Sequence, residues 1–84
     1  VKIYPNPASR YLNITYKNYE GKTSLVSIFG VSGQLLKTIR LEVDDQSLHQ
    51  INLNGLTDGF YFIRIVDQQN NIIKSERLVI QNSR

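Results

Sequence analysis

Apolar and polar residues alternate along almost the whole chain with a period of two, rather than the period of about 3.6 that a helix shows. In the clearest case, Tyr61, Ile63 and Ile65 alternate with Phe62 and Arg64. Alternation of this kind predicts strands that each bury one face. The predicted strands are seven, over residues 3–4, 11–16, 25–29, 35–43, 50–53, 60–66 and 72–80.

Turn-forming residues separate these strands. Segments rich in Gly, Asn and Asp interrupt the alternation at 30–33 (GVSG), 54–59 (NGLTDG) and 67–71 (DQQNN). Turn signals recur at roughly eight to twelve residues, a spacing typical of an antiparallel β-sandwich. The chain is therefore predicted to be all-β, with one domain over residues 1–84.

The stretch YPNPAS at residues 4–9 interrupts the pattern near the start. Pro5 and Pro7 have no backbone N–H, so they fit only an edge strand or a bend. Asn6 precedes a proline and is biased toward an extended conformation. We expect this segment to let the first strand leave its sheet and to protect an edge against pairing with another chain.

Composition narrows the function classes. The chain has 84 residues, of which 40% are hydrophobic, and this suits a small globular domain rather than a disordered tail. It has no cysteine, which excludes disulfides and thiolate metal sites, and no methionine, from which we expect a piece of a longer protein. The net charge is +3, and ten Lys and Arg residues are spread along the chain. Without a basic stripe, no nucleic-acid partner is expected.

Candidate catalytic and metal-ligating residues are few. His49 is the single histidine, and three of the seven carboxylates, Asp44, Asp58 and Asp67, are interpreted as turn residues, because Asp bonds to its local backbone. Asp44 and Asp45 form an adjacent pair that suits a calcium loop. The triplet 13–15 (NIT) matches a glycosylation acceptor, but it lies inside a predicted strand. We expect no enzyme, no metal site and no cofactor.

The strongest predicted strand has two further features. Phe60, Phe62 and Arg64 share the face opposite the buried one, so this face is either covered by neighbouring side chains or contacts a partner. Gly59 at the loop end is expected to take a positive φ. Tyr61 is placed like the tyrosine of a tyrosine corner, whose hydroxyl bonds back to the preceding loop.

Four segments in order resemble one family of bacterial domains. They are YPNPAS with LNI (4–14), VSIFGVSGQLL (26–36), INLNGLTDGFYFIRI (51–65) and a basic-then-aliphatic ending with Lys74 and RLVI (74–80). The family is the type A C-terminal sorting domain of the type IX secretion system (Por secretion system) of Bacteroidetes. The resemblance runs from Tyr4 to Gln81, nearly the whole chain.

The resemblance implies a seven-stranded antiparallel Ig-like β-sandwich at the C-terminus of a larger cargo protein. Such a domain is a secretion signal that the type IX machinery recognises in the periplasm and carries through the outer membrane, to the cell surface or outside the cell. A surface sortase then removes it, and the cut is expected upstream of Val1. The residues expected to be recognised are Pro5, Asn6, Pro7, Gly33, Gly59, Tyr61, Lys74, Arg77, Leu78 and Val79.

Two other functions fit the same pattern. A carbohydrate-binding or adhesion module would show an exposed aromatic platform or a calcium loop at Asp44 and Asp45. An Ig-like interaction domain of a machinery or signalling protein would remain in the mature protein. For the sorting signal, the last strand, 72–80, is expected to be a second docking element, because a terminal edge strand can extend a partner's sheet, and the same edge allows an edge-strand dimer.

Overall fold

The structure is a computed structural model of the chain and describes residues 1–17, 19, 23–43 and 48–82. All seven predicted strands are confirmed, with ends that differ by at most two residues. They are β1 (Lys2–Tyr4), β2 (Tyr11–Thr15), β3 (Thr23–Gly30), β4 (Leu35–Glu42), β5 (Leu48–Asn52), β6 (Gly59–Asp67) and β7 (Ile72–Ile80). Within these residues no helix is long and apolar enough to cross a membrane.

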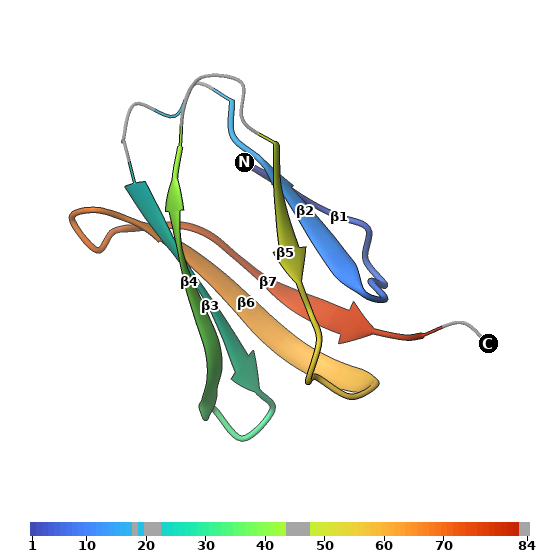
Figure 1. Cartoon of the computed structure of the whole chain (residues 1–84). Helices are drawn as coiled ribbons and strands as arrows, with labels where there is room; N and C mark the ends of the chain where they lie inside the picture. Colours follow the sequence, from blue (N-terminus) through green and yellow to red (C-terminus); the bar gives the residue numbers. More distant parts are fainter. Residues whose placement is uncertain (18, 20–22, 44–47, 83–84) are drawn as a thin grey trace.

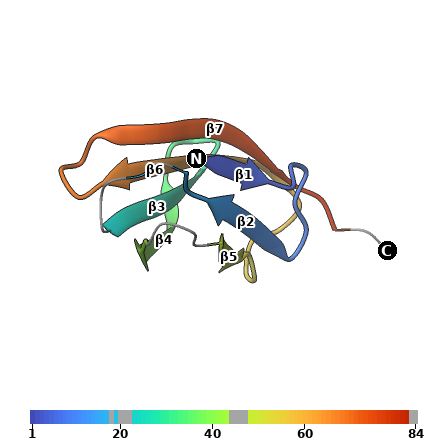
Figure 2. The same ribbon diagram turned by 90° about the horizontal axis from the view of Figure 1, so that it is seen from above.

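The strands form two antiparallel sheets. The smaller sheet has the order β1-β2-β5, and the larger has the order β4-β3-β6-β7. The two views in Figures 1 and 2 show the smaller sheet lying against one side of the larger one. This is an Ig-like sandwich in which the fourth strand stays beside the third, instead of joining the first sheet as it does in antibody constant domains. The predicted fold class is confirmed.

The core lies between the sheets and is formed by the apolar row of each strand. Leu12 and Ile14 of β2 face Ile28 of β3 and Ile63 and Ile65 of β6, and all five side chains are 0% exposed. These rows follow from the strand alternation, which sends every second side chain inward. Each such side chain stabilises the fold by about 1.5–3 kcal/mol relative to exposure in water.

Tyr16 closes the core at the end of β2. The strand ends at Thr15, one residue before the predicted end, and Tyr16 turns inward to 4% exposure. Its hydroxyl forms a hydrogen bond of 2.6 Å with buried Ser24, and burial raises the pKa of the Tyr16 phenol. His49 packs edge-on against the same ring at 5.7 Å between centroids.

The turn between β6 and β7 is organised by one carboxylate. Asp67 Oδ1 accepts backbone N–H bonds from Gln69 and Asn71, both at 2.9 Å. Asn70 takes the left-handed conformation that this tight turn requires, with φ of 70°. The backbone N–H of Asn71, more than any other group, holds the pKa of the Asp67 carboxyl below its ordinary value.

Asp67→Asn should therefore lower the melting temperature at pH 7, because the neutral amide accepts the same bonds more weakly. A carboxyl whose pKa falls on folding contributes stability above its unfolded pKa of about 4 and loses it as the pH drops through the folded value. The difference between variant and wild type should then close in acid. Thermal unfolding across this pH range measures it, and Glu42→Gln is the control, since Glu42 is an exposed carboxylate 3.8 Å from Arg40. A gap that persists in acid would contradict the assignment.

Candidate recognition site

The segment between β1 and β2 crosses from one sheet to the other. β1 pairs with β2 in the smaller sheet, whereas Ala8 forms a parallel bridge with Ile80 of β7 in the larger sheet. Ala8 donates its N–H to the carbonyl of Val79 and accepts from the N–H of Gln81, both at 2.8 Å. The predicted departure of the first strand from its sheet is confirmed.

The side chain of Asn6 adds two hydrogen bonds to this contact with β7. Its Nδ2 donates to the carbonyl of Arg77 at 2.8 Å, and its Oδ1 accepts from the N–H of Val79 at 3.0 Å. A carboxamide offers the same donor and acceptor as a peptide group, so Asn6 occupies the place of a strand residue beside β7. We call residues 5–8, with their bonds to residues 77–81, the PNPA clasp.

The clasp limits where a partner strand can pair with the backbone of β7. β7 is an edge of the larger sheet, as predicted, but the clasp occupies its outer backbone groups from Arg77 to Gln81. Backbone groups of alternate residues point to the same side of a strand, so Ser75 faces the same way beyond the clasp. Among the described residues, the edge is open to strand addition only in its first half, a narrower site than the whole of 72–80.

The predicted corner at the start of β6 is confirmed. Gly59 has a φ of 152°, and Tyr61 is 8% exposed. The Tyr61 hydroxyl donates to the carbonyl of Thr57 at 2.5 Å, which ties the loop to the core. Gly33, with a φ of 90°, forms the β3–β4 turn by donating its N–H to the carbonyl of Gly30 at 2.9 Å.

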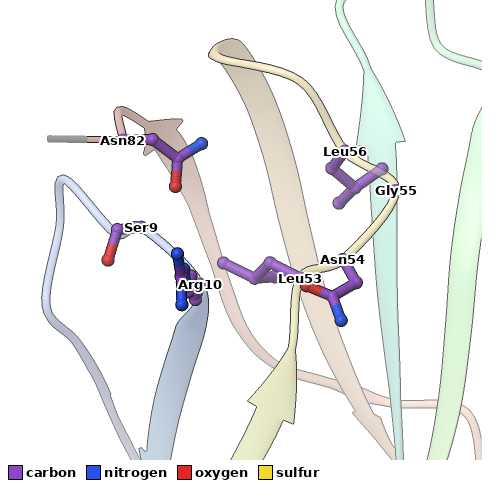
Figure 3. A pocket seen from close by; sticks show the side chains of 7 residues that line it. All are labelled: Ser9, Arg10, Leu53, Asn54, Gly55, Leu56 and Asn82. Atoms are coloured by element: carbon purple, nitrogen blue, oxygen red, sulfur yellow. The ribbon is translucent and has the colours of Figure 1, made fainter. Parts of the chain in front are cut away.

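A hollow lies beside the clasp, where three segments distant in the sequence meet (Figure 3). Ser9 and Arg10 precede β2, Leu53 to Leu56 follow β5, and Asn82 follows β7. Asn82 is held by Asp58, whose Oδ1 accepts from its Nδ2 at 2.6 Å and from its N–H at 3.3 Å. Sequence reasoning missed this hollow, because no local pattern connects its three segments.

Residues 2–81 match the family described as "Secretion system C-terminal sorting domain". The chain belongs to this family. Its type IX membership, inferred above from four segments, is confirmed. Beta-agarase A of Zobellia galactanivorans is a relative, 32% identical over 71 residues. These residues are 84% of this chain and 12% of the agarase, so the chain spans a small part of that protein's length. A sorting domain of this family is a non-catalytic secretion signal.

The sorting domain gathers most of the predicted recognition residues in one half of the sandwich. Pairing of Gly59 with Ile80 places the start of β6 at the end of β7, next to the clasp with Pro5, Asn6 and Pro7. Gly30 pairs with Tyr61, so the turn that contains Gly33 lies at the same end. Pro5, Asn6, Pro7, Gly33 and Gly59 at this end are the candidate recognition residues. Tyr61 and Leu78 are paired across β6 and β7 and are buried, so they stabilise the fold.

The two predicted basic residues of β7 are separated by the strand geometry. Lys74 and Arg77 are three residues apart and therefore lie on opposite faces. Lys74 Nζ lies 3.8 Å from Glu76 Oε2 at the rim between the sheets. Arg77 is exposed and pairs across the strands with Phe62, next to half-buried Val79.

Two other sequence features are the acidic pair and the glycosylation triplet. Asp44 and Asp45, the calcium alternative, lie outside the described residues. Within the part of the chain that the structure describes, no cluster of three or more His, Asp or Glu side chains is placed to hold a metal ion. Asn13 of the glycosylation triplet is half-buried in β2, with its Oδ1 3.4 Å from Gln50 Nε2.

Asn6→Ala should open the clasp. The loss of two hydrogen bonds should lower the free energy of unfolding of the sorting domain by about 1–2 kcal/mol, measured by urea denaturation. Hydrogen exchange of the Val79 amide should become faster, since this amide loses its acceptor. Asn54→Ala is the control, because the hydrogen bond of Asn54 uses only its backbone N–H. Unchanged exchange at Val79 would contradict the role given to the carboxamide.

Gly59→Val should destabilise the domain through the backbone alone. Apart from its two chain neighbours, no residue has an atom within 4 Å of the position that a Cβ would occupy at Gly59, so the penalty is expected to come from its φ. We expect a loss of about 1–3 kcal/mol in the free energy of unfolding. Gly30→Ala is the matched control, since a Cβ there makes ordinary contacts of 3.5 Å with Gln34 and Leu36. If the two substitutions cost the same, the conformational argument fails.

Proposed function

We propose that this domain directs an N-terminal cargo through the outer membrane by the type IX system, and that the machinery recognises it as a folded unit. The observation that supports this is the extent of the family match. Residues 2–81 are also the residues that build the sandwich, from the first residue of β1 to the Gln81 bond that closes the clasp. A signal of this extent suits recognition of a folded shape rather than of a short linear tail.

The arrangement of the ends suits this role. The N-terminus lies apart from the end of β7, and the clasp lies beside the end of β7 (Figure 1). A cargo attached before β1 therefore leaves the clasp end accessible to the machinery. In this proposal the sortase cuts the segment before β1, which releases the sandwich without breaking any of its strands.

Recognition is proposed to use the exposed members of the clasp end. Pro5, Asn6 and Pro7 are exposed in the clasp, and Gly33 is exposed in the β3–β4 turn at the same end of the larger sheet. The alternative of a carbohydrate module also has a supporting observation, since Phe60 and Phe62 are exposed on one face. Family membership favours sorting, and the route of transit and the removal of the domain are the parts to be tested.

The test is export of a reporter. We would fuse the chain behind a periplasm-targeted fluorescent protein in two Bacteroidetes hosts, one with a working type IX system and one without it. We expect the reporter on the surface or in the medium of the competent host only, shortened by the mass of the domain. The reporter without the chain is the control and should remain periplasmic in both hosts.

The other outcomes separate the alternatives. A reporter that reaches the surface with the domain still attached would support a retained domain and would overturn sortase removal. A reporter that remains in the periplasm of both hosts would overturn the sorting proposal.

A further inference from the structure

The larger sheet exposes an apolar surface on the side that faces away from the smaller sheet. We call this surface the outer aromatic face, and it consists of Phe29, Leu35, Phe60, Phe62, Arg64 and Arg77. The strand register places Phe62 between Phe29 and Arg77, with Leu35 beyond Phe29. Phe60, Leu35 and Phe62 are 61%, 58% and 47% exposed.

The sandwich does not need these aromatic residues. The inner row of β6, with Tyr61, Ile63 and Ile65, already fills the core. On the solvent side of an antiparallel sheet, polar residues serve the fold equally well. Two exposed phenylalanines on β6, continued by Phe29 on β3 and Leu35 on β4, therefore indicate a contact surface.

The charges on this face are positive at its centre. The guanidinium carbon of Arg64 lies 4.7 Å from the ring centroid of Phe29, and Arg77 stands beside Phe62. Among the described carboxylates, Glu42 shares this side of the sheet, but it lies near Arg40 at the far end of β4. The complementary partner therefore has an apolar centre and carboxylates placed to meet two arginines.

The neighbouring elements limit how a partner binds. The clasp occupies the edge of β7 beside Phe60 and Arg77, so strand addition is closed at this end. A partner there meets side chains instead of backbone. A second copy docked face to face would gather two copies each of Arg64 and Arg77 in one interface, and like charges in an interface are unfavourable. The occupant that fits is a different protein.

We propose that the outer aromatic face binds an apolar, carboxylate-bearing surface of a protein of the type IX machinery. The inference rests on the proposed sorting function and adds a second contact to the clasp end. Phe60 and Phe62 supply the apolar contact, and Arg64 and Arg77 pair with the carboxylates.

The test uses the reporter fusion in the competent host. The variants are Phe62→Ser, the pair Arg64→Glu with Arg77→Glu, and the conservative pair Arg64→Lys with Arg77→Lys. Controls on other surfaces are Tyr11→Ser, at a side chain 46% exposed on the smaller sheet, and Lys17→Glu, at an exposed lysine. Thermal unfolding of each purified variant checks that it is folded. If Phe62→Ser unfolds, the pair Arg64→Glu with Arg77→Glu still tests the face, because both arginines are exposed.

We expect Phe62→Ser and the glutamate pair to reduce export by about ten-fold or more, while the lysine pair and both controls export normally. Selection for restored export of the glutamate pair should return Asp→Lys or Glu→Lys changes in a machinery protein. Normal export of folded Phe62→Ser and glutamate-pair variants, beside an exported wild type, would overturn this inference alone. Failure of the wild type to be exported would instead overturn the proposed function.

Two measurements on the isolated chain address other occupants of the face. Sedimentation equilibrium tests for a second copy, and co-sedimentation with vesicles of phosphatidylglycerol and phosphatidylcholine tests for a membrane. We expect a monomer that does not bind the vesicles. A dimer or vesicle binding that Phe62→Ser abolishes would overturn the assignment of the face to a machinery protein.

Discussion

The structure depends on the burial of one row of side chains from each strand between two small sheets. β6 lies at the centre of this contact, because it pairs with β3 on one side and β7 on the other while Ile63 and Ile65 enter the core. A chain of 84 residues without cysteine has only this single layer of packing to hold it. The fold therefore requires that the strands keep their register and that the ends of the sandwich stay closed.

The clasp closes one of these ends and joins the two sheets. Because Pro5 and Pro7 cannot donate backbone hydrogen bonds, the chain leaves the smaller sheet at this point, and the side chain of Asn6 makes the bonds that a backbone would make. Ala8 then returns the backbone itself to pairing with β7. One short segment thus ends a strand, satisfies an exposed edge and connects β1 to the other sheet.

Local features of this fold could be predicted from the sequence, and long-range ones could not. The seven strands and the Tyr61 corner follow from alternation and turn residues, which are properties of neighbouring positions. The proline segment was correctly predicted to leave its sheet, but its partner was not, since Asn6 and Arg77 are 71 positions apart. The hollow at Arg10 and Asn82 depends on where three loops meet. The family resemblance supplied the Ig-like topology and the function, which alternation alone does not specify.

Strand β6 has apolar side chains on both faces, so alternation alone does not fix its register. A shift of one residue would turn Phe60, Phe62 and Arg64 inward, and the two phenylalanines alone would not prevent it, since they are as apolar as the row they would replace. Arg64 prevents it, because an unpaired guanidinium in the core is strongly unfavourable.

The corner fixes the same register from the end of the strand. Gly59 takes a φ of 152°, and the Tyr61 hydroxyl reaches the carbonyl of Thr57 only when Tyr61 points inward. With Arg64 on the outer face and Tyr61 hydrogen-bonded to Thr57 on the inner face, β6 has one stable register. It is therefore able to expose aromatic residues on its outer face without ambiguity about which face is buried.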